Sequence, residues 1–110
     1  MTARDGSTLD RLFQTLAARR GADPATSYTA KLLHAGAERA AQKLGEEALE
    51  TALAATAGAR ERVVAESADL LYHLLVVWAA TGVSPEEVWR ELARREGRSG
   101  LEEKASRQDR

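Results

Sequence analysis

Two neighbouring segments of the sequence carry acidic side chains at helical spacing. Their five acids are Glu46, Glu47, Glu50, Glu66 and Asp69. Because successive helix residues rotate by about 100°, the three glutamates of the first segment share an arc of about 100°, and the two acids of the second lie one turn apart on one face. Ligand sets made only of oxygen suit hard cations such as Mg²⁺ or Mn²⁺ better than Zn²⁺. The two segments therefore predict a site for a hard divalent cation, provided that folding brings them together.

Gly58 supplies a turn that would bring the two segments together. Glu50 stands eight residues before Gly58 and Glu66 eight residues after it, while Glu47 and Asp69 each stand eleven residues away. In an antiparallel hairpin folded at this glycine, the members of each pair lie at matching heights, roughly 12 Å and 16 Å from the turn. We therefore expect four or five carboxylates to converge on one spot.

A solvent-exposed acidic face is the plain alternative to a metal site, and it is the commoner origin of such a stripe on a single helix. The second segment argues against it. The arc that carries Glu66 and Asp69 continues through His73 to Val76, and residues 70–80 are apolar nearly all round, which predicts burial. Clustered carboxylates at the edge of a core are costly unless a cation neutralises them. We therefore favour a metal site, at which phosphate oxygens would supply the remaining Mg²⁺ ligands.

Other kinds of site fit these residues less well. A di-iron bundle requires Glu-x-x-His on two helices, whereas His73 follows Asp69 by four residues. A glycosidase uses two separate carboxylates across a sugar cleft, and the sequence has no EF-hand loop. The chain has no cysteine, which excludes disulfides, thiolate zinc sites and a cysteine nucleophile.

The elements that would position the acids are all helices. Alanine, leucine, glutamate and arginine dominate the sequence, and we see no convincing strand pattern or repeat. We predict helices over residues 7–20, over two turns ending at Gly36, over 37–57, over 60–81, and from Pro85 to about Gly97. Ser7 with Asp10 is expected to cap the first helix, and Ser84 with Pro85 the last.

The expected architecture is a single all-α domain over residues 1–110. It is a bundle of four to five helices based on a helical hairpin, and residues 1–6 and 98–110 are expected to be flexible. Residues 70–80 are apolar on every side, yet one chain supplies few helices to cover them. We therefore expect a homodimer, in which the helix containing these residues is central and a second chain completes the bundle.

The composition indicates a soluble, cytoplasmic protein. The 16 Lys and Arg residues balance 17 Asp and Glu residues, and the resulting net charge of -1 gives no support for binding to nucleic acid or anionic membranes. The first residues lack the apolar segment of a secretory signal. The longest apolar run is shorter than the ~20 residues that span a bilayer. We expect neither a nucleic-acid nor a membrane partner.

Four sequence blocks resemble a known enzyme family. The pattern Glu-Glu-x-x-Glu, followed after 15 residues by Glu-x-x-Asp, is similar to that of the all-α nucleotide pyrophosphohydrolases of the MazG-like superfamily. The blocks SYTAKLL (27–33), QKLGEEALE (42–50), ADLLYHLLV (68–76) and SGLEEKASR (99–107) together resemble the phosphoribosyl-ATP pyrophosphohydrolases. The resemblance covers nearly the whole chain, and the acidic positions show no departure from the family pattern.

The resemblance implies a specific activity. The substrate would be 1-(5-phosphoribosyl)-ATP, cleaved between its α- and β-phosphates to give 1-(5-phosphoribosyl)-AMP and pyrophosphate in the second step of histidine biosynthesis. Family members are homodimers whose site lies near the subunit interface. The five acids would be catalytic residues of a magnesium site. Our hypothesis assigns the metal, Mg²⁺ or alternatively Mn²⁺, to Glu47, Glu50, Glu66 and Asp69.

Basic residues could bind the phosphates of such a substrate. The candidates are Lys31, Lys43, Arg98, Lys104 and Arg107. For Lys43, an intrahelical ion pair with Glu46 or Glu47 is an equal alternative, and Lys31 could be an ordinary surface charge. The three residues of the C-terminal segment could close over the triphosphate or belong to a solvated tail. We interpret His73 as a core or supporting residue rather than a ligand, and the two tryptophans as core or interface residues.

Two other functions stay open at this point. A nucleotide pyrophosphohydrolase that acts on ordinary or damaged NTPs would use the same chemistry, although the four matching blocks favour the histidine-pathway enzyme. A non-catalytic helical dimerisation module would leave the convergent acids unexplained. Release of pyrophosphate in a metal-dependent reaction would eliminate the module.

Overall fold

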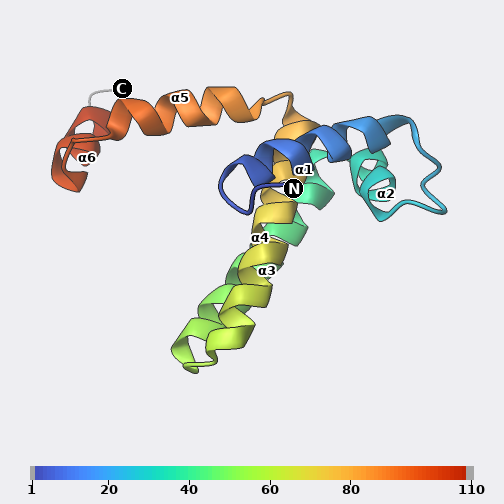
Figure 1. Cartoon of the computed structure of the whole chain (residues 1–110), viewed down its shortest axis with the longest axis horizontal. Coiled ribbons are helices and arrows are strands. Elements are labelled where there is room, and N and C mark those ends of the chain that lie inside the picture. Colours follow the sequence, from blue (N-terminus) through green and yellow to red (C-terminus); the bar gives the residue numbers. More distant parts are fainter. Residues whose placement is uncertain (1, 109–110) are drawn as a thin grey trace.

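The computed structural model describes residues 2–108, and helices account for all the regular structure of this range (Figure 1). The elements in chain order are α1 (Ser7–Ala18), the 3₁₀ turn η1 (Arg19–Gly21), α2 (Tyr28–Ala35), α3 (Ala37–Thr56), α4 (Arg60–Thr81), α5 (Pro85–Arg95) and α6 (Gly100–Gln108). The all-α class is therefore confirmed, with six α-helices in the described range where four to five were predicted.

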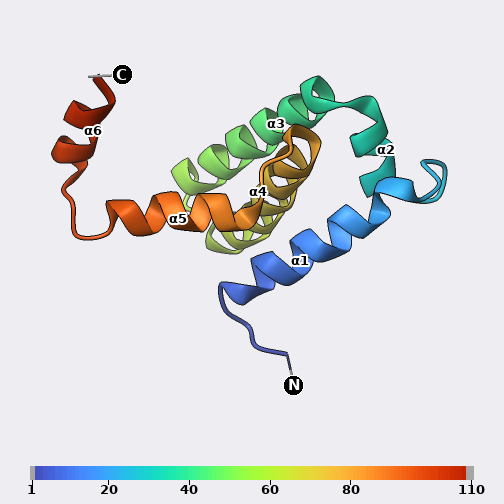
Figure 2. The ribbon, with the colours of Figure 1, turned by 90° about the horizontal axis from the view of Figure 1, so that it is seen from above.

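The antiparallel pair α3 and α4 forms the centre of the molecule (Figures 1 and 2). The two helices begin and end within one residue of their predicted bounds. Gly58 turns the chain between them with a φ of 68°, a left-handed conformation that glycine adopts without steric cost. The predicted hairpin at this glycine is confirmed, and it sets the register in which the acids face one another.

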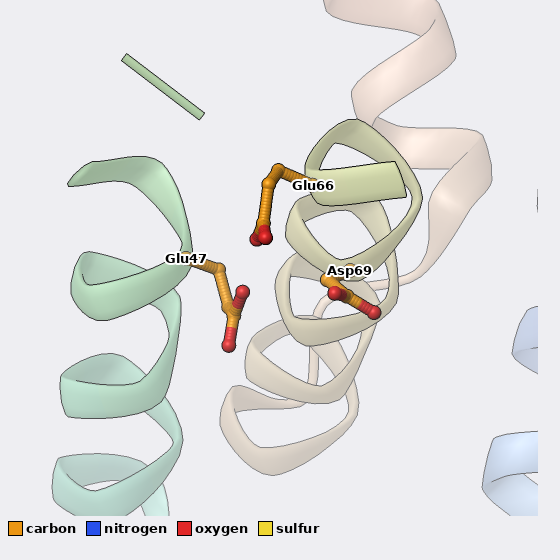
Figure 3. Close-up of side chains that lie close together, drawn as sticks. All are labelled: Glu47, Glu66 and Asp69. Carbon is orange, nitrogen blue, oxygen red and sulfur yellow. The ribbon is translucent and has the colours of Figure 1, made fainter. Parts of the chain in front are cut away.

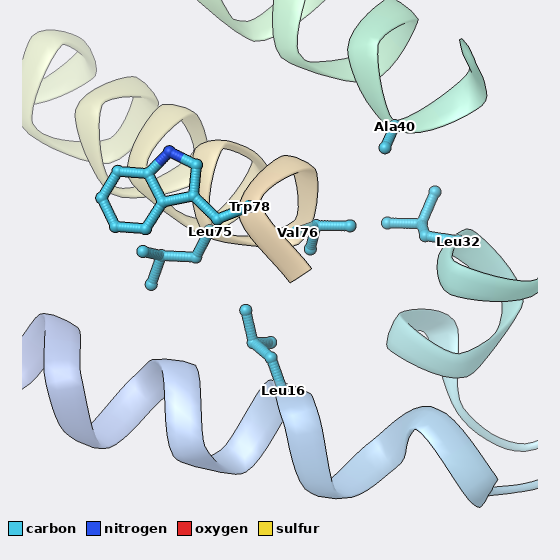
Figure 4. Close-up of a cluster of buried hydrophobic side chains, with 6 residues drawn as sticks. All are labelled: Leu16, Leu32, Ala40, Leu75, Val76 and Trp78. Atoms are coloured by element: carbon cyan, nitrogen blue, oxygen red, sulfur yellow. The ribbon is translucent and has the colours of Figure 1, made fainter. Parts of the chain in front are cut away.

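The hydrophobic core lies at the end of the hairpin opposite Gly58, where α1 and α2 pack against it (Figure 4). Its buried side chains are Leu16, Leu32, Ala40, Leu75, Val76 and Trp78. The part of α4 expected to be buried does contribute half of this set, while Leu71 keeps 40% of its surface exposed. The core therefore buries the C-terminal half of α4 on one side, and leaves Leu71 in the same helix exposed to solvent.

The N-terminal cap predicted from the sequence is present in α5 but not in α1. Ser84 and Glu87 form the full capping box at the start of α5, with Pro85 in the first turn, as predicted. The predicted Ser7 cap of α1 is wrong, because Ser7 lies inside the helix and its amide donates instead to Asp5 Oδ1 at 2.9 Å. At α2, Ser27 Oγ accepts from the amide of Ala30, and this cap defines a helix that the sequence indicated only loosely.

α5 leaves the bundle after Gly82 and carries α6 at its far end (Figures 1 and 2). Trp89 attaches the start of α5, since its ring lies edge-on to Trp78 at 5.9 Å and its indole nitrogen donates to Asp10 at 2.8 Å. The radius of gyration is 16.0 Å, against roughly 13 Å for a compact domain of this length. The single chain is therefore more extended than a self-sufficient domain.

α6 is a helix where the sequence predicted a flexible tail. Glu103 of α6 is nearly buried against the end of α5. Its carboxylate lies 2.8 Å from Arg94, 3.5 Å from Arg95 and 3.7 Å from Arg98. These ion pairs give the polar segment a docking contact that its low hydrophobicity did not suggest. Residue 1 and residues 109–110, also expected to be flexible, lie outside the described range.

α4 is long and apolar enough, by length and composition alone, to cross a membrane. The core helix of a soluble bundle passes the same test. Here α4 contains Glu66 and Asp69 and packs against three other helices. The observation is therefore weak evidence for a membrane span.

Candidate metal and substrate site

Three carboxylates converge across the α3–α4 hairpin (Figure 3). Glu47 projects from α3, and Glu66 and Asp69 project from α4. Each residue offers an oxygen atom, and the three oxygens lie within 4.8 Å of one another. The antiparallel register set by Gly58 accounts for this arrangement, because it places Glu47 and Asp69 at the same height and Glu66 one turn nearer the bend.

The convergence carries an electrostatic cost. Glu47 and Glu66 are partly buried, whereas Asp69 is exposed. Desolvation raises the pKa of Glu66 above its usual value, and the neighbouring carboxylates of Glu47, Glu50 and Asp69 raise it further. Three acids that repel one another and share an all-oxygen environment are the donor set that a hard divalent cation neutralises. Mg²⁺ or Mn²⁺ therefore fits the residues of this cluster.

Two of the five predicted acids lie outside this cluster. Glu46 accepts a hydrogen bond from the ammonium group of Lys43 at 3.0 Å, which confirms the ion-pair interpretation of that lysine. Glu50 lies one turn nearer the bend than Glu47, and its carboxylate is 3.8 Å from the guanidinium of Arg62. The structure thus brings together Glu47 with the two acids of α4, while the charge of Glu50 acts on Glu66.

Comparison with known proteins places the chain in a family. A family model described as "Phosphoribosyl-ATP pyrophosphohydrolase" matches residues 9–96. The chain belongs to this family. Three curated relatives bear the name phosphoribosyl-ATP pyrophosphatase. The protein of Parvibaculum lavamentivorans is 61% identical over 98% of this chain and 99% of its own length. That of Azospirillum brasilense is 56% identical over 92% of this chain and 91% of its own length. That of Paracoccus denitrificans is 59% identical over 90% of this chain and 92% of its own length.

In this member of the phosphoribosyl-ATP pyrophosphohydrolase family, the basic residues expected to bind phosphate are spread over distant parts of the chain. Lys31 is exposed on α2, and hydrogen bonding to Glu46 raises the pKa of Lys43. Arg98 forms ion pairs with Glu102 at 3.9 Å and with Glu103. Lys104 and Arg107 are exposed on α6, which Figure 1 shows at the far end of α5, away from the hairpin. Within one chain, the three C-terminal cations are therefore not assembled around the acids.

An aromatic cluster adjoins the acids, and most of it was not predicted from the sequence. The rings of Tyr72 and His73 meet edge to face at 5.0 Å, and Tyr28 lies against both at 6.4 Å and 6.1 Å. His73 keeps only 6% of its surface exposed, and its Nδ1 has no hydrogen-bond partner among the described residues. Desolvation, and after it the charge of Lys43, lowers the pKa of His73. This burial agrees with the interpretation of His73 as a core or supporting residue.

The two tryptophans lie where the sequence analysis expected them. Trp78 belongs to the core cluster with 9% of its surface exposed, and Trp89 packs against that cluster from α5.

Tyr28 could have been singled out from the sequence, because it directly follows Ser27, the serine that caps α2. An aromatic residue at the exposed first position of a short helix contributes little to a core, which is a reason to consider another role.

Proposed function

We propose that this family member hydrolyses 1-(5-phosphoribosyl)-ATP to 1-(5-phosphoribosyl)-AMP and pyrophosphate, the second step of histidine biosynthesis. The observation that carries the proposal is the convergence of Glu47, Glu66 and Asp69 from two helices of a chain that belongs to the phosphoribosyl-ATP pyrophosphohydrolase family. The names of its curated relatives support the same substrate. The reaction is a hydrolysis of a phosphoric anhydride.

In this proposal the acids form the magnesium site and are the catalytic residues. Glu47, Glu66 and Asp69 would hold Mg²⁺, or alternatively Mn²⁺, and Glu50 would join them as a fourth ligand by turning away from Arg62. A bound divalent cation supplies charge neutralisation on phosphate oxygens. Glu46 would contribute by holding Lys43 beside the site. A carboxylate that is not fully engaged as a ligand would position the attacking water.

We also propose that two chains assemble into a homodimer with α4 central and the site near the subunit interface. Each helix of the hairpin exposes apolar side chains at helical spacing. They are Leu49 and Leu53 on α3 and Val64 and Leu71 on α4. Each of these residues keeps between 40% and 61% of its surface exposed, and the single chain is more extended than a compact domain. Burial against a second chain would remove this apolar surface from water.

The remaining parts of the proposal concern substrate contacts and location. Lys31 and Lys43 would contact phosphate groups from α2 and α3, and Arg98, Lys104 and Arg107 would approach from the C-terminal segment.

The net charge of -1 supports the absence of nucleic-acid and membrane partners, and a biosynthetic role supports a cytoplasmic location.

A substrate panel tests the proposal. The purified protein with Mg²⁺ is assayed for pyrophosphate release from 1-(5-phosphoribosyl)-ATP and from the four common NTPs. We expect kcat/KM to be higher for 1-(5-phosphoribosyl)-ATP than for every NTP. Comparable values for the NTPs would instead identify a nucleotide-pool pyrophosphohydrolase, and no release from any substrate would leave only a structural role.

A further inference from the structure

Tyr28 is an exposed aromatic residue that contacts the partly buried Tyr72 and the buried His73. Its ring stacks on Tyr72 with an interplanar angle of 19° and meets His73 edge-on, yet 51% of the residue is exposed. Tyr72 is itself fixed by a hydrogen bond between its hydroxyl and that of Thr29, a nearly buried residue of α2. The cluster therefore presents an aromatic surface whose orientation is set before any ligand arrives.

This surface lies about one helical turn from the acids. Tyr72 and His73 follow Asp69 by three and four residues on α4, and one turn of an α-helix rises 5.4 Å. On α3, Lys43 precedes Glu47 by one turn, and the phenol of Tyr28 is close enough to Lys43 to contribute to its raised pKa. Tyr28, the first residue of α2, thus lies further along the hairpin from Gly58 than the acid cluster does.

The proposed substrate has a chemical group that suits this position. If its α- and β-phosphates lie at the acids, the purine lies one ribose further away, a separation comparable to a helical turn. In 1-(5-phosphoribosyl)-ATP the purine is substituted at N1, which makes its amidine more basic than adenine and leaves the ring cationic at neutral pH. A cationic ring placed over a tyrosine face gains both stacking and cation–π attraction, whereas the neutral adenine of ATP gains only stacking.

The charges around Tyr28 also favour a cationic ring. Two lysines lie near this surface: Lys43, with which Glu46 pairs at 3.0 Å, and Lys31, which is exposed to solvent one turn after Tyr28 on α2. The acids one turn away are negatively charged. A protonated N1-substituted purine would therefore meet a surface that is aromatic and flanked by carboxylates.

We propose that Tyr28 is the purine-binding residue of the site and that it discriminates the N1-substituted, cationic purine from the neutral adenine of ATP. This inference rests on the proposed function, because it assigns a part of that substrate to a side chain. It adds a specificity-determining residue on α2, outside the acidic segments.

The test compares two substitutions of one side chain. Tyr28→Phe keeps the ring and removes the hydroxyl, whereas Tyr28→Leu removes the aromatic face and keeps an apolar side chain. Leu92→Ala on α5 is the matched control, since Leu92 is also 51% exposed but lies outside the aromatic cluster. For each variant we measure kcat and KM for 1-(5-phosphoribosyl)-ATP, the inhibition constant of ATP, and the mass in solution.

Tyr28→Leu is expected to raise KM for 1-(5-phosphoribosyl)-ATP about tenfold, with a smaller change in the inhibition constant of ATP and an unchanged mass. Leu92→Ala should behave like the wild type, and Tyr28→Phe should raise KM much less than Tyr28→Leu because it keeps the aromatic ring. An unchanged KM in Tyr28→Leu, or an equal loss for both nucleotides, would overturn the inference. A loss of dimer mass would also overturn it by showing that a second chain covers the ring.

Calorimetric binding of 1-(5-phosphoribosyl)-AMP separates this inference from the proposed function. The product keeps the cationic purine, and its binding requires no turnover. We expect Tyr28→Leu to weaken this binding about tenfold relative to the wild type. A wild type that binds the product but does not hydrolyse the substrate would contradict the proposed function alone, whereas equal affinities in wild type and variant would contradict the role of Tyr28 alone.

Discussion

Glu47 on α3 and Glu66 on α4 face each other across the hairpin, each with a carboxylate oxygen within 4.8 Å of the other and of Asp69 (Figure 3). Neither helix alone creates this proximity, because it depends on the register fixed at Gly58. Since like charges at this separation repel, the folded protein holds an arrangement whose stability depends on a counter-charge. The first two predictions follow from that dependence.

The first prediction concerns the acids. Glu47→Gln, Glu50→Gln, Glu66→Gln and Asp69→Asn should each lower kcat with 1-(5-phosphoribosyl)-ATP by about 100-fold, because each removes a charge that binds the metal. Glu61→Gln is the control, since Glu61 is an exposed acid of the same helix α4 but lies outside the cluster. Steady-state assays decide the matter, and wild-type kcat in Glu66→Gln would contradict the assignment.

The second prediction concerns metal binding without turnover. Mg²⁺ should raise the unfolding temperature of the wild type, because a ligand that binds only the folded state stabilises it. In Glu66→Gln the increase should be smaller, while the metal-free variant should unfold at the same or a higher temperature than the metal-free wild type, because one repelling charge is gone. Scanning calorimetry in EDTA and in Mg²⁺ measures both effects. An identical Mg²⁺ shift in wild type and variant would place the ion elsewhere.

The third prediction concerns the acid stability of α5. Hydrogen bonds from Arg94 and Arg95 lower the pKa of Glu91 to about 2 from a usual value of 4.5. A lowered pKa means that the folded state favours the ionised carboxyl, so its contribution is present above about pH 4.5 and is lost as pH falls toward 2. A carbon-13 NMR titration of the Glu91 carboxyl should show this value, and Arg94→Ala combined with Arg95→Ala should return the midpoint toward 4.5. A midpoint near 4.5 in the wild type would disprove the ion pairs.

The fourth prediction concerns assembly. Sedimentation at micromolar concentration should give the mass of a dimer. Val64→Lys or Leu71→Lys should yield monomers, because a charge on the exposed apolar side of α4 cannot be buried without a large cost. Leu92→Lys, which changes an exposed leucine of α5, is the control and should keep the dimer. A wild type that sediments as a monomer would refute the proposed assembly.

The fifth prediction concerns the C-terminal segment. Deletion of residues 98–110 should raise KM for 1-(5-phosphoribosyl)-ATP and weaken discrimination against ATP, because the segment carries Arg98, Lys104 and Arg107. Since α6 lies away from the acids of its own chain, these cations would act on the site of the second chain of a dimer (Figure 1). Mixing the truncated chain with Glu66→Gln should then restore activity, because a mixed dimer contains one site with intact acids and an intact opposite tail. Unchanged kcat/KM after truncation would show the segment to be uninvolved.

The sequence predicted the hairpin well because its signals are local. Gly58 and Gly82 end or turn helices by adopting positive φ values, and the long apolar and acidic stripes between them have helical periodicity. Tertiary contacts overrode weaker local signals elsewhere. Ser7 did not become a cap because Asp5 already accepts its amide, and α6 docks because three arginines surround Glu103.

The candidate site was predicted only in part for a similar reason. Helical angles placed five acids near one another, but they could not show which side chains would turn to other partners. Glu46 turned to Lys43, and Glu50 lies beside Arg62. Tyr28 belongs to a separate helix, so its place beside Tyr72 and His73 depends on how α2 packs on the hairpin, which no periodicity within the sequence encodes.

The stoichiometry of product release tests the central claim most directly. Purified protein, Mg²⁺ and 1-(5-phosphoribosyl)-ATP are mixed, and the nucleotide product and the phosphorus species are quantified over time by phosphorus-31 NMR. We predict that 1-(5-phosphoribosyl)-AMP and pyrophosphate appear in equal amounts, and that Glu47→Gln and added EDTA both suppress them. Release of orthophosphate with 1-(5-phosphoribosyl)-ADP, or an unreacted substrate, would contradict the proposed cleavage between the α- and β-phosphates.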